Sequence, residues 1–193
     1  MEKLGLMDRL KARIVNYADD FVICCRGTAQ QAMAAMRQIM AKVKLTVNET
    51  KTHVCDALTE TFNFLGYTFG VHRSNRTGRK LLCGKPSVKR VARVCEKISA
   101  MTERGRGCLS EEQMVYELNL VLGGWANYFC LGPVSEAYRK INSHVRYRFR
   151  RWWERKHRRR ASGPHWRWSR WMQEKFGLLQ LKWDPSRLPH ATA

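Results

Sequence analysis

Acidic residues are scarce in this 193-residue chain, because 16 Asp and Glu stand against 36 Lys and Arg. The formal net charge is +20 and the pI is near 10.2. An imbalance of this size favours a polyanionic partner, and the alternative is a ribosomal-type or merely very soluble basic protein. Hydrophobic residues make up 44% of the chain, which argues against a disordered basic tail and suits one domain or two small ones.

The sequence also lacks paired cysteines, zinc-type spacings and long apolar runs. Its seven cysteines include no Cys-x-x-Cys pair and its six histidines are scattered, so we expect reduced, mostly buried thiols. There is no signal-peptide pattern at the N-terminus and no apolar run long enough to cross a membrane. We therefore expect a soluble, cytoplasmic protein with no membrane partner. Internal repeats, a Gly-rich phosphate loop and a Ser/His/Asp arrangement are absent too.

The segment Tyr17-Ala18-Asp19-Asp20 is the most informative feature that is present. It separates two short apolar runs, Ala12–Val15 and Phe21–Cys25, which predicts a β-hairpin with both carboxylates at its tip. Adjacent carboxylates repel each other, and Mg²⁺ relieves that repulsion because hard cations prefer oxygen ligands. Two-metal nucleotidyl transfer uses such a cluster, whereas the alternative interpretation is a solvated turn.

Residues 12–70 predict an α+β unit. A helix begins at Thr28, which forms a capping-box pair with Gln31 and precedes an apolar stripe of helical period. Further along, His53-Val54-Cys55 predicts a short strand. The aromatic run Phe62–Gly70 predicts another strand, whose internal glycine indicates a bulge or a close backbone approach.

A last hairpin precedes the second half of the chain, whose pattern predicts only helices. A basic turn at Arg73–Lys80 tips a hairpin, and Gly84–Ser87 marks a boundary beyond which Ser87 caps a helix. Ser110 and Gln113 form a second capping box, whose helix continues to Gly123-Gly124. We expect three segments: residues 1–84, a helical domain at 85–183, and a tail at 184–193.

A long helix is predicted from Val134, with one apolar stripe that ends at Trp152. The other faces and the following residues are basic with almost no acid, which favours phosphate contact over an ordinary solvated face. The candidate RNA-binding residues are Arg139, Lys140, Arg146, Arg150, Arg151, Arg155, Arg158 and Arg159.

Aromatic residues lie among these cations. Stacking on unpaired bases is expected where aromatics adjoin arginine, and the alternative is that they anchor the core. The candidates for stacking are Trp153, His157, Trp166 and Trp168, whereas Trp152 and Trp171 are assigned to the core.

Three motifs in the first half resemble reverse transcriptases. Tyr17-Ala18-Asp19-Asp20 resembles the palm hairpin, Leu45–Thr52 resembles the next block of that family, and Phe62–Phe69 resembles the primer-grip region. In the second half, Leu120–Phe129 is similar to the maturase-specific domain of group II intron-encoded proteins, which serves there as the polymerase thumb and also grips intron RNA. The resemblance covers residues 13–183 and implies a partial palm followed by a helical thumb.

The resemblance implies an RNA-directed DNA polymerase and a role for each matching position. Asp19 and Asp20 would hold catalytic Mg²⁺, and Lys51 would stabilise charge on the leaving pyrophosphate. Tyr17 and Ala18 would line the nucleotide and primer end. The residues that would position the primer are Phe64, Leu65, Gly66 and Tyr67. The implied partners are group II intron RNA and a DNA primer or target.

The family also carries a fingers domain and an earlier block that supplies a third catalytic carboxylate, and nothing before Tyr17 resembles that block. We therefore expect this fragment alone to be inactive as a polymerase. The chain therefore looks like the C-terminal half of a reverse transcriptase/maturase, either truncated or complemented by a separate N-terminal half. Three hypotheses stay open: RNA-templated DNA synthesis, a non-catalytic RNA-binding maturase module that helps intron RNA fold and splice, and an inactive relic.

Overall fold

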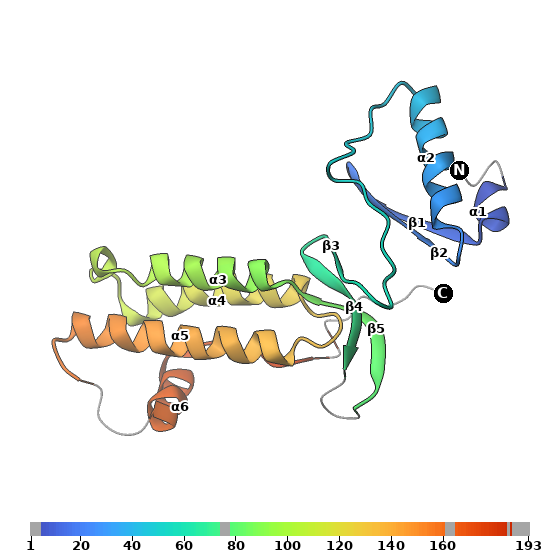
Figure 1. Ribbon diagram of the computed structural model, residues 1–193. Coiled ribbons are helices and arrows are strands. Elements are labelled where there is room, and N and C mark those ends of the chain that lie inside the picture. The colour runs from blue at the N-terminus through green and yellow to red at the C-terminus, as the bar shows by residue number, and fades with distance from the viewer. Residues whose placement is uncertain (1–4, 74–77, 161–164, 185, 187–193) are drawn as a thin grey trace. The chain divides into compact units, whose positions relative to one another are not determined.

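The computed structural model describes residues 5–73, 78–160, 165–184 and 186, and it divides into two compact units (Figure 1). The first unit runs to Phe64 and includes Phe69–Val71, and the second comprises Leu65–Thr68 and the chain from His72 onward. Helices and small sheets both occur, so the predicted α+β class is confirmed. The predicted limits of the functional domains differ from these units and stay a prediction.

A β-hairpin forms the centre of the first unit. Helix α1 (Leu6–Arg9) precedes β1 (Ala12–Tyr17), which pairs antiparallel with β2 (Asp20–Cys25) so that Tyr17 lies opposite Asp20. The predicted hairpin is therefore confirmed. Helix α2 (Ala29–Lys42) completes a small core. That core consists of Leu10, Ala12 and Ala32, with Ile23, Cys25 and Ala35 packed against it.

Two expectations for the first unit are wrong. Thr28 precedes α2 but does not cap it, because its hydroxyl donates a 2.6 Å hydrogen bond to the carbonyl of Leu10 instead. Residues 53–55 form no strand. Around them the chain folds back in local turns, one of which is fixed by the carboxylate of Asp56 accepting from the amide of Leu58 at 2.9 Å. An apolar run of three residues makes a strand only where a neighbouring strand can pair with it.

The aromatic run that predicted one strand forms two, β3 (Phe62–Phe64) and β4 (Tyr67–Arg73). Leu65 and Gly66 connect them with φ values of +51° and +83°. Positive φ at both loop positions is the requirement of a type I′ hairpin turn, which glycine meets at low cost. Gly66 thus marks a turn rather than a bulge. The predicted hairpin from β4 to β5 (Lys80–Pro86) is confirmed, although residues 74–77 lie outside the described ranges, and the sheet order is β3-β4-β5.

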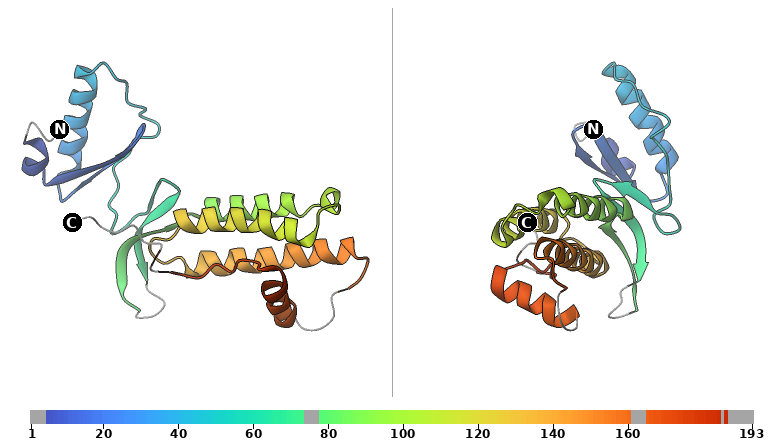
Figure 2. Two further views of the ribbon diagram at one scale, coloured as in Figure 1. Left: turned by 180° about the vertical axis from the view of Figure 1, so that it is seen from behind. Right: turned by 90° about the vertical axis from the view of Figure 1, so that its left-hand side faces the viewer.

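Helices α3 (Val88–Met101), α4 (Glu111–Tyr128) and α5 (Ser135–Lys156) run alongside one another in the second unit, and α6 (His165–Phe176) lies across them (Figures 1 and 2). They enclose the larger core of the molecule. Its most deeply buried side chains are Ile98, Met114, Leu118, Leu122, Ile141, Phe149, Trp152 and Met172.

The predicted helix starts of the second unit are confirmed. The Ser87 side chain accepts a hydrogen bond from the amide of Arg90, and Ser110 and Gln113 form a complete capping box. Helix α4 does not stop at Gly123-Gly124, however, and continues to Tyr128. Each glycine costs a helix only about 1 kcal/mol relative to alanine. Burial of the flanking Leu122 and Ala126 against the core offsets that cost.

The chain beyond α6 is held to the bundle by two asparagines. The Asn142 amide donates to the carbonyl of Leu181 and accepts from its N–H, both at 2.9 Å. Asn119 makes the same kind of pair with the carbonyl of Gly177 and the N–H of Leu179. Each amide thereby satisfies one backbone donor and one backbone acceptor, as a neighbouring strand would.

Candidate nucleic-acid interface

The predicted carboxylate pair lies at the tip of the β1–β2 hairpin. Ala18 and Asp19 form a two-residue loop in which Ala18 has a φ of +52°. Positive φ at the first loop position matches a type II′ turn, whose twist suits the flanking strands. Asp19, Asp20 and Tyr17 are exposed, with 66% of the Tyr17 surface open to solvent. The local sequence therefore fixes two adjacent carboxylates where a cation or a nucleic acid can reach them.

The residues around this pair fit a metal site only in part. Across the described ranges, no group of three or more His, Cys, Asp and Glu side chains could hold a metal ion. Two carboxylates on neighbouring positions supply part of the ligand set that a two-metal centre needs. We therefore derive no catalytic step through Mg²⁺ from this structure.

Lys51 lies in a turn after α2. The side chain of Asn48 accepts hydrogen bonds there from the Lys51 amide at 3.3 Å and from the Thr50 hydroxyl at 2.7 Å. The Lys51 side chain is exposed, and in the described part of the chain it makes no ion pair with Asp19 or Asp20. Its predicted contact with a triphosphate stays a prediction.

The turn predicted to position a primer is locked to helix α4 by two tyrosines. The hydroxyl of Tyr67 donates to the carbonyl of Tyr128 at 2.7 Å, and the hydroxyl of Tyr128 donates to the carbonyl of Leu65 at 2.8 Å. The amide of Ser87 donates to the carbonyl of Gly66 at 3.0 Å. Tyr67 is only 6% exposed, and its burial raises the pKa of the phenol to about 12. The conformation of this turn is thus set by the helical unit. Phe64, which precedes the turn, is half-buried.

The predicted apolar stripe of α5 is confirmed, because Tyr138, Ile141, Val145, Phe149 and Trp152 are buried. Trp168 is 6% exposed and packs in the core with its ring tilted against that of Phe149, so the expectation that it stacks on bases is wrong. Trp168 lies on the side of α6 that faces the other helices. Its distance from the arginines along the sequence does not reveal this.

Other aromatic predictions have mixed outcomes. Trp152 is a core residue as predicted, and Trp171 packs against the core. Trp153 is half-buried between His157, Trp168 and Trp171. The side chain of Trp166 lies outside the described part of the structure.

Several of the cations predicted to bind RNA have protein partners. Arg150 forms an ion pair with Glu154 at 3.0 Å, and Arg155 donates to the carbonyl of Thr102 at 2.7 Å. Arg146 donates to the Ser143 hydroxyl at 3.1 Å. The Arg150 and Arg146 contacts lie within α5, whereas the Arg155 contact joins α5 to the end of α3.

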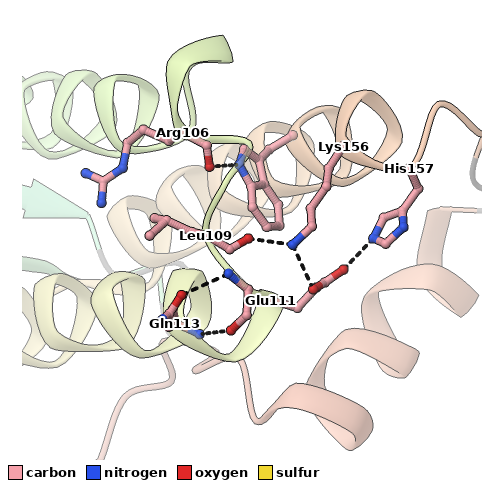
Figure 3. A network of polar contacts seen from close by, with 8 residues as sticks. Arg106, Leu109, Glu111, Gln113, Lys156 and His157 are labelled. Atoms are coloured by element: carbon pink, nitrogen blue, oxygen red, sulfur yellow. Dashed lines mark hydrogen bonds and ion pairs between the residues drawn. The ribbon is translucent and has the colours of Figure 1, made fainter.

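The C-terminal end of α5 is pinned to the first turn of α4 through Glu111 (Figure 3). Its carboxylate accepts from Lys156 at 3.1 Å and from His157, and the indole of Trp152 donates to the carbonyl of Arg106 beside it. Burial alone would raise the pKa of Glu111, but the hydrogen bonds from His157 and Lys156 outweigh it and lower that pKa. His157, a candidate for stacking, is therefore engaged with Glu111.

The remaining predicted cations are free of carboxylates. They are exposed, and none of them has an ion-pair partner within the described ranges. This group consists of Arg139, Lys140, Arg151, Arg158 and Arg159.

Comparison with protein families finds one match in each half of the chain. Residues 91–183 match the family described as group II intron, maturase-specific domain, and residues 3–69 match reverse transcriptase (RNA-dependent DNA polymerase). Together the two matches are consistent with a fragment of an intron-encoded reverse transcriptase/maturase. No curated protein matches it. The resemblance drawn from the sequence motifs is thereby confirmed.

Two features of this chain cannot be predicted from the sequence. Tyr128 holds the Leu65–Gly66 turn across 63 positions of the chain, and no local pattern links the two. The sequence also gives no sign that Arg104 lies near the cations of α5, because only the fold brings the end of α3 beside α5. In the described part of the chain, no helix is long and apolar enough to span a membrane.

Proposed function

We propose that the maturase domain of this chain binds group II intron RNA through phosphate contacts and helps that RNA fold and splice. One observation carries the proposal. Helix α5 buries its apolar stripe in the core and presents exposed cations that have no carboxylate partner among the residues that the structure describes. When such a cation neutralises a phosphate, the counterions condensed on the RNA are released. Their release supplies affinity without base specificity.

RNA binding does not need the aspartate pair, which lies in the other unit. Titrating a fluorescent group II intron RNA with the full chain tests this, with Asp19→Asn/Asp20→Asn beside it. We expect equal affinities for the two proteins. Arg139→Gln/Lys140→Gln should weaken binding and make the log–log salt slope shallower by about one to two units. An unchanged slope in that variant would remove these residues from the interface.

A second proposed function is RNA-directed DNA synthesis, which the reverse transcriptase match and the exposed aspartate pair favour. Additional metal ligands would have to come from a separate reverse-transcriptase half or from a second copy of the chain. Primer extension on an RNA template with a DNA primer and Mg²⁺ tests the proposal. Extension by the wild type and none by Asp19→Asn/Asp20→Asn would support it. Synthesis that survives in the double variant would show that it does not depend on this pair.

A further inference from the structure

Two arginine side chains of α5 donate hydrogen bonds to residues at the C-terminal end of α3. Arg148 donates to the carbonyl of Ser99 at 2.7 Å and to the hydroxyl of Thr102 at 3.0 Å. Arg155, two turns further along α5, donates to the carbonyl of Thr102 at 2.7 Å. Helix C-terminal carbonyls carry partial negative charge, so they hold both guanidinium groups at one place.

Two further arginines lie close enough to Arg155 for their charges to act on it, and one of them, Arg151, also contacts Tyr147. Arg151 lies between Arg148 and Arg155 on α5 and is exposed, and Arg104 is exposed on the 3₁₀ turn Arg104–Arg106 that follows α3. The pKa of Arg155 is lowered first by burial and then by the positive charges of Arg148, Arg151 and Arg104. Within the described residues, none of the four forms an ion pair with a carboxylate.

Capping the end of α3 explains only part of this arrangement. The carbonyls of Ser99 and Thr102 are satisfied by Arg148 and Arg155, whereas Arg104 and Arg151 add positive charge without contacting either carbonyl. Gathering unneutralised like charges costs free energy in the protein alone. An anion that binds there recovers that cost, and the guanidinium fork matches the geometry of phosphate oxygens.

We propose that Arg104, Arg148, Arg151 and Arg155, here called the arginine cluster, form a preorganised binding site for neighbouring phosphates of an RNA backbone. The inference rests on the proposed RNA-binding function and deepens it. It assigns the strongest phosphate contacts to the junction of α3 and α5 rather than to the whole basic surface. Because the anchored pair is already ordered, phosphate binding there loses less side-chain entropy than binding to free surface cations.

The test compares two double variants that remove the same charge. Arg104→Gln/Arg151→Gln alters the two exposed members of the cluster, and Arg158→Gln/Arg159→Gln alters two exposed cations after α5. Affinity for a fluorescent RNA hairpin is measured against salt, and thermal melting checks the fold of each variant. We expect the cluster variant to bind about ten-fold more weakly, with a salt slope shallower by about two units, and the control to lose much less.

Equal losses in the two variants would overturn the cluster while leaving RNA binding in place. A wild type that binds no RNA would overturn both the cluster and the proposed function. A second measurement needs no variant. RNA should protect Arg104 and Arg151 of the wild type from an arginine-specific dicarbonyl reagent more strongly than Arg158 and Arg159, as read by mass spectrometry. Uniform protection would contradict the proposed site.

Discussion

Tyr67 and Tyr128 join two segments of the helical unit that lie far apart in the sequence. Each hydroxyl donates to a backbone carbonyl of the other's segment, so the β3–β4 turn and the end of α4 are joined twice. The sequence predicts Asp19 and Asp20 at a hairpin tip because strand, turn and strand are contiguous. It does not predict the tyrosine pair, because that pair depends on contacts between distant segments.

Titration of Tyr67 tests this pair at the residue scale. The folded pKa of about 12 lies above the ordinary value of 10.0, so its contribution to stability is complete below pH 10 and is lost as the pH rises through 12. We expect the ultraviolet titration of tyrosine to contain a late component that disappears in Tyr67→Phe. The matched control is Tyr116→Phe, which alters an exposed tyrosine on α4 and should keep that component. A late component that survives in Tyr67→Phe would contradict the assignment.

Helix α5 shows which features of an element the sequence pattern predicts and which it does not. Its start and its buried stripe follow from the periodicity alone. The partners of its cations do not, because Arg150 and Arg155 look alike in the sequence and only the fold assigns one to Glu154 and the other to Thr102. The same limit applies to Gly123-Gly124, where local propensity predicts a stop and burial of the neighbouring residues extends the helix.

Attachment of the segment after α6 depends on a buried amide in α5. Asn142→Ala should lower the free energy of unfolding by about 2 kcal/mol, because it leaves the N–H and carbonyl of Leu181 without their partner. Asn119→Ala removes the same kind of pair at a more exposed place and should cost less. Chemical denaturation measures both, and an equal or larger loss in Asn119→Ala would contradict the burial argument.

The stability of the contact between α4 and α5 should decrease at acidic pH. The pKa of Glu111 is lowered, so its stabilising effect is present above the ordinary value of 4.5 and is lost as the pH falls through the folded value. Glu111→Gln should therefore reduce the melting temperature at neutral pH and weaken its dependence on acidic pH. Glu112→Gln is the control, since Glu112 lies in the same first turn and is exposed. Identical pH profiles for the two variants would show that the ion pairs contribute nothing.

Across the whole molecule, the sequence predicts the α+β class, the hairpin, the helical half and the family. It predicts less about the interface, because charge counting cannot separate cations that fix helices from cations that remain available to a ligand. Lys156 and Arg150 form ion pairs with carboxylates, whereas Arg139 and Arg158 face solvent. The net charge of +20 nevertheless sets the general expectation of a polyanionic partner.

The salt dependence of RNA binding by the intact chain tests the central claim most directly. If at least four exposed cations contact phosphates, the logarithm of the association constant should fall linearly with the logarithm of salt concentration, with a slope of about −3 or steeper. Asp19→Asn/Asp20→Asn should give the same line. A slope near zero, or a loss of RNA affinity in the aspartate variant, would contradict the account of a phosphate-binding maturase domain that works independently of the carboxylate pair.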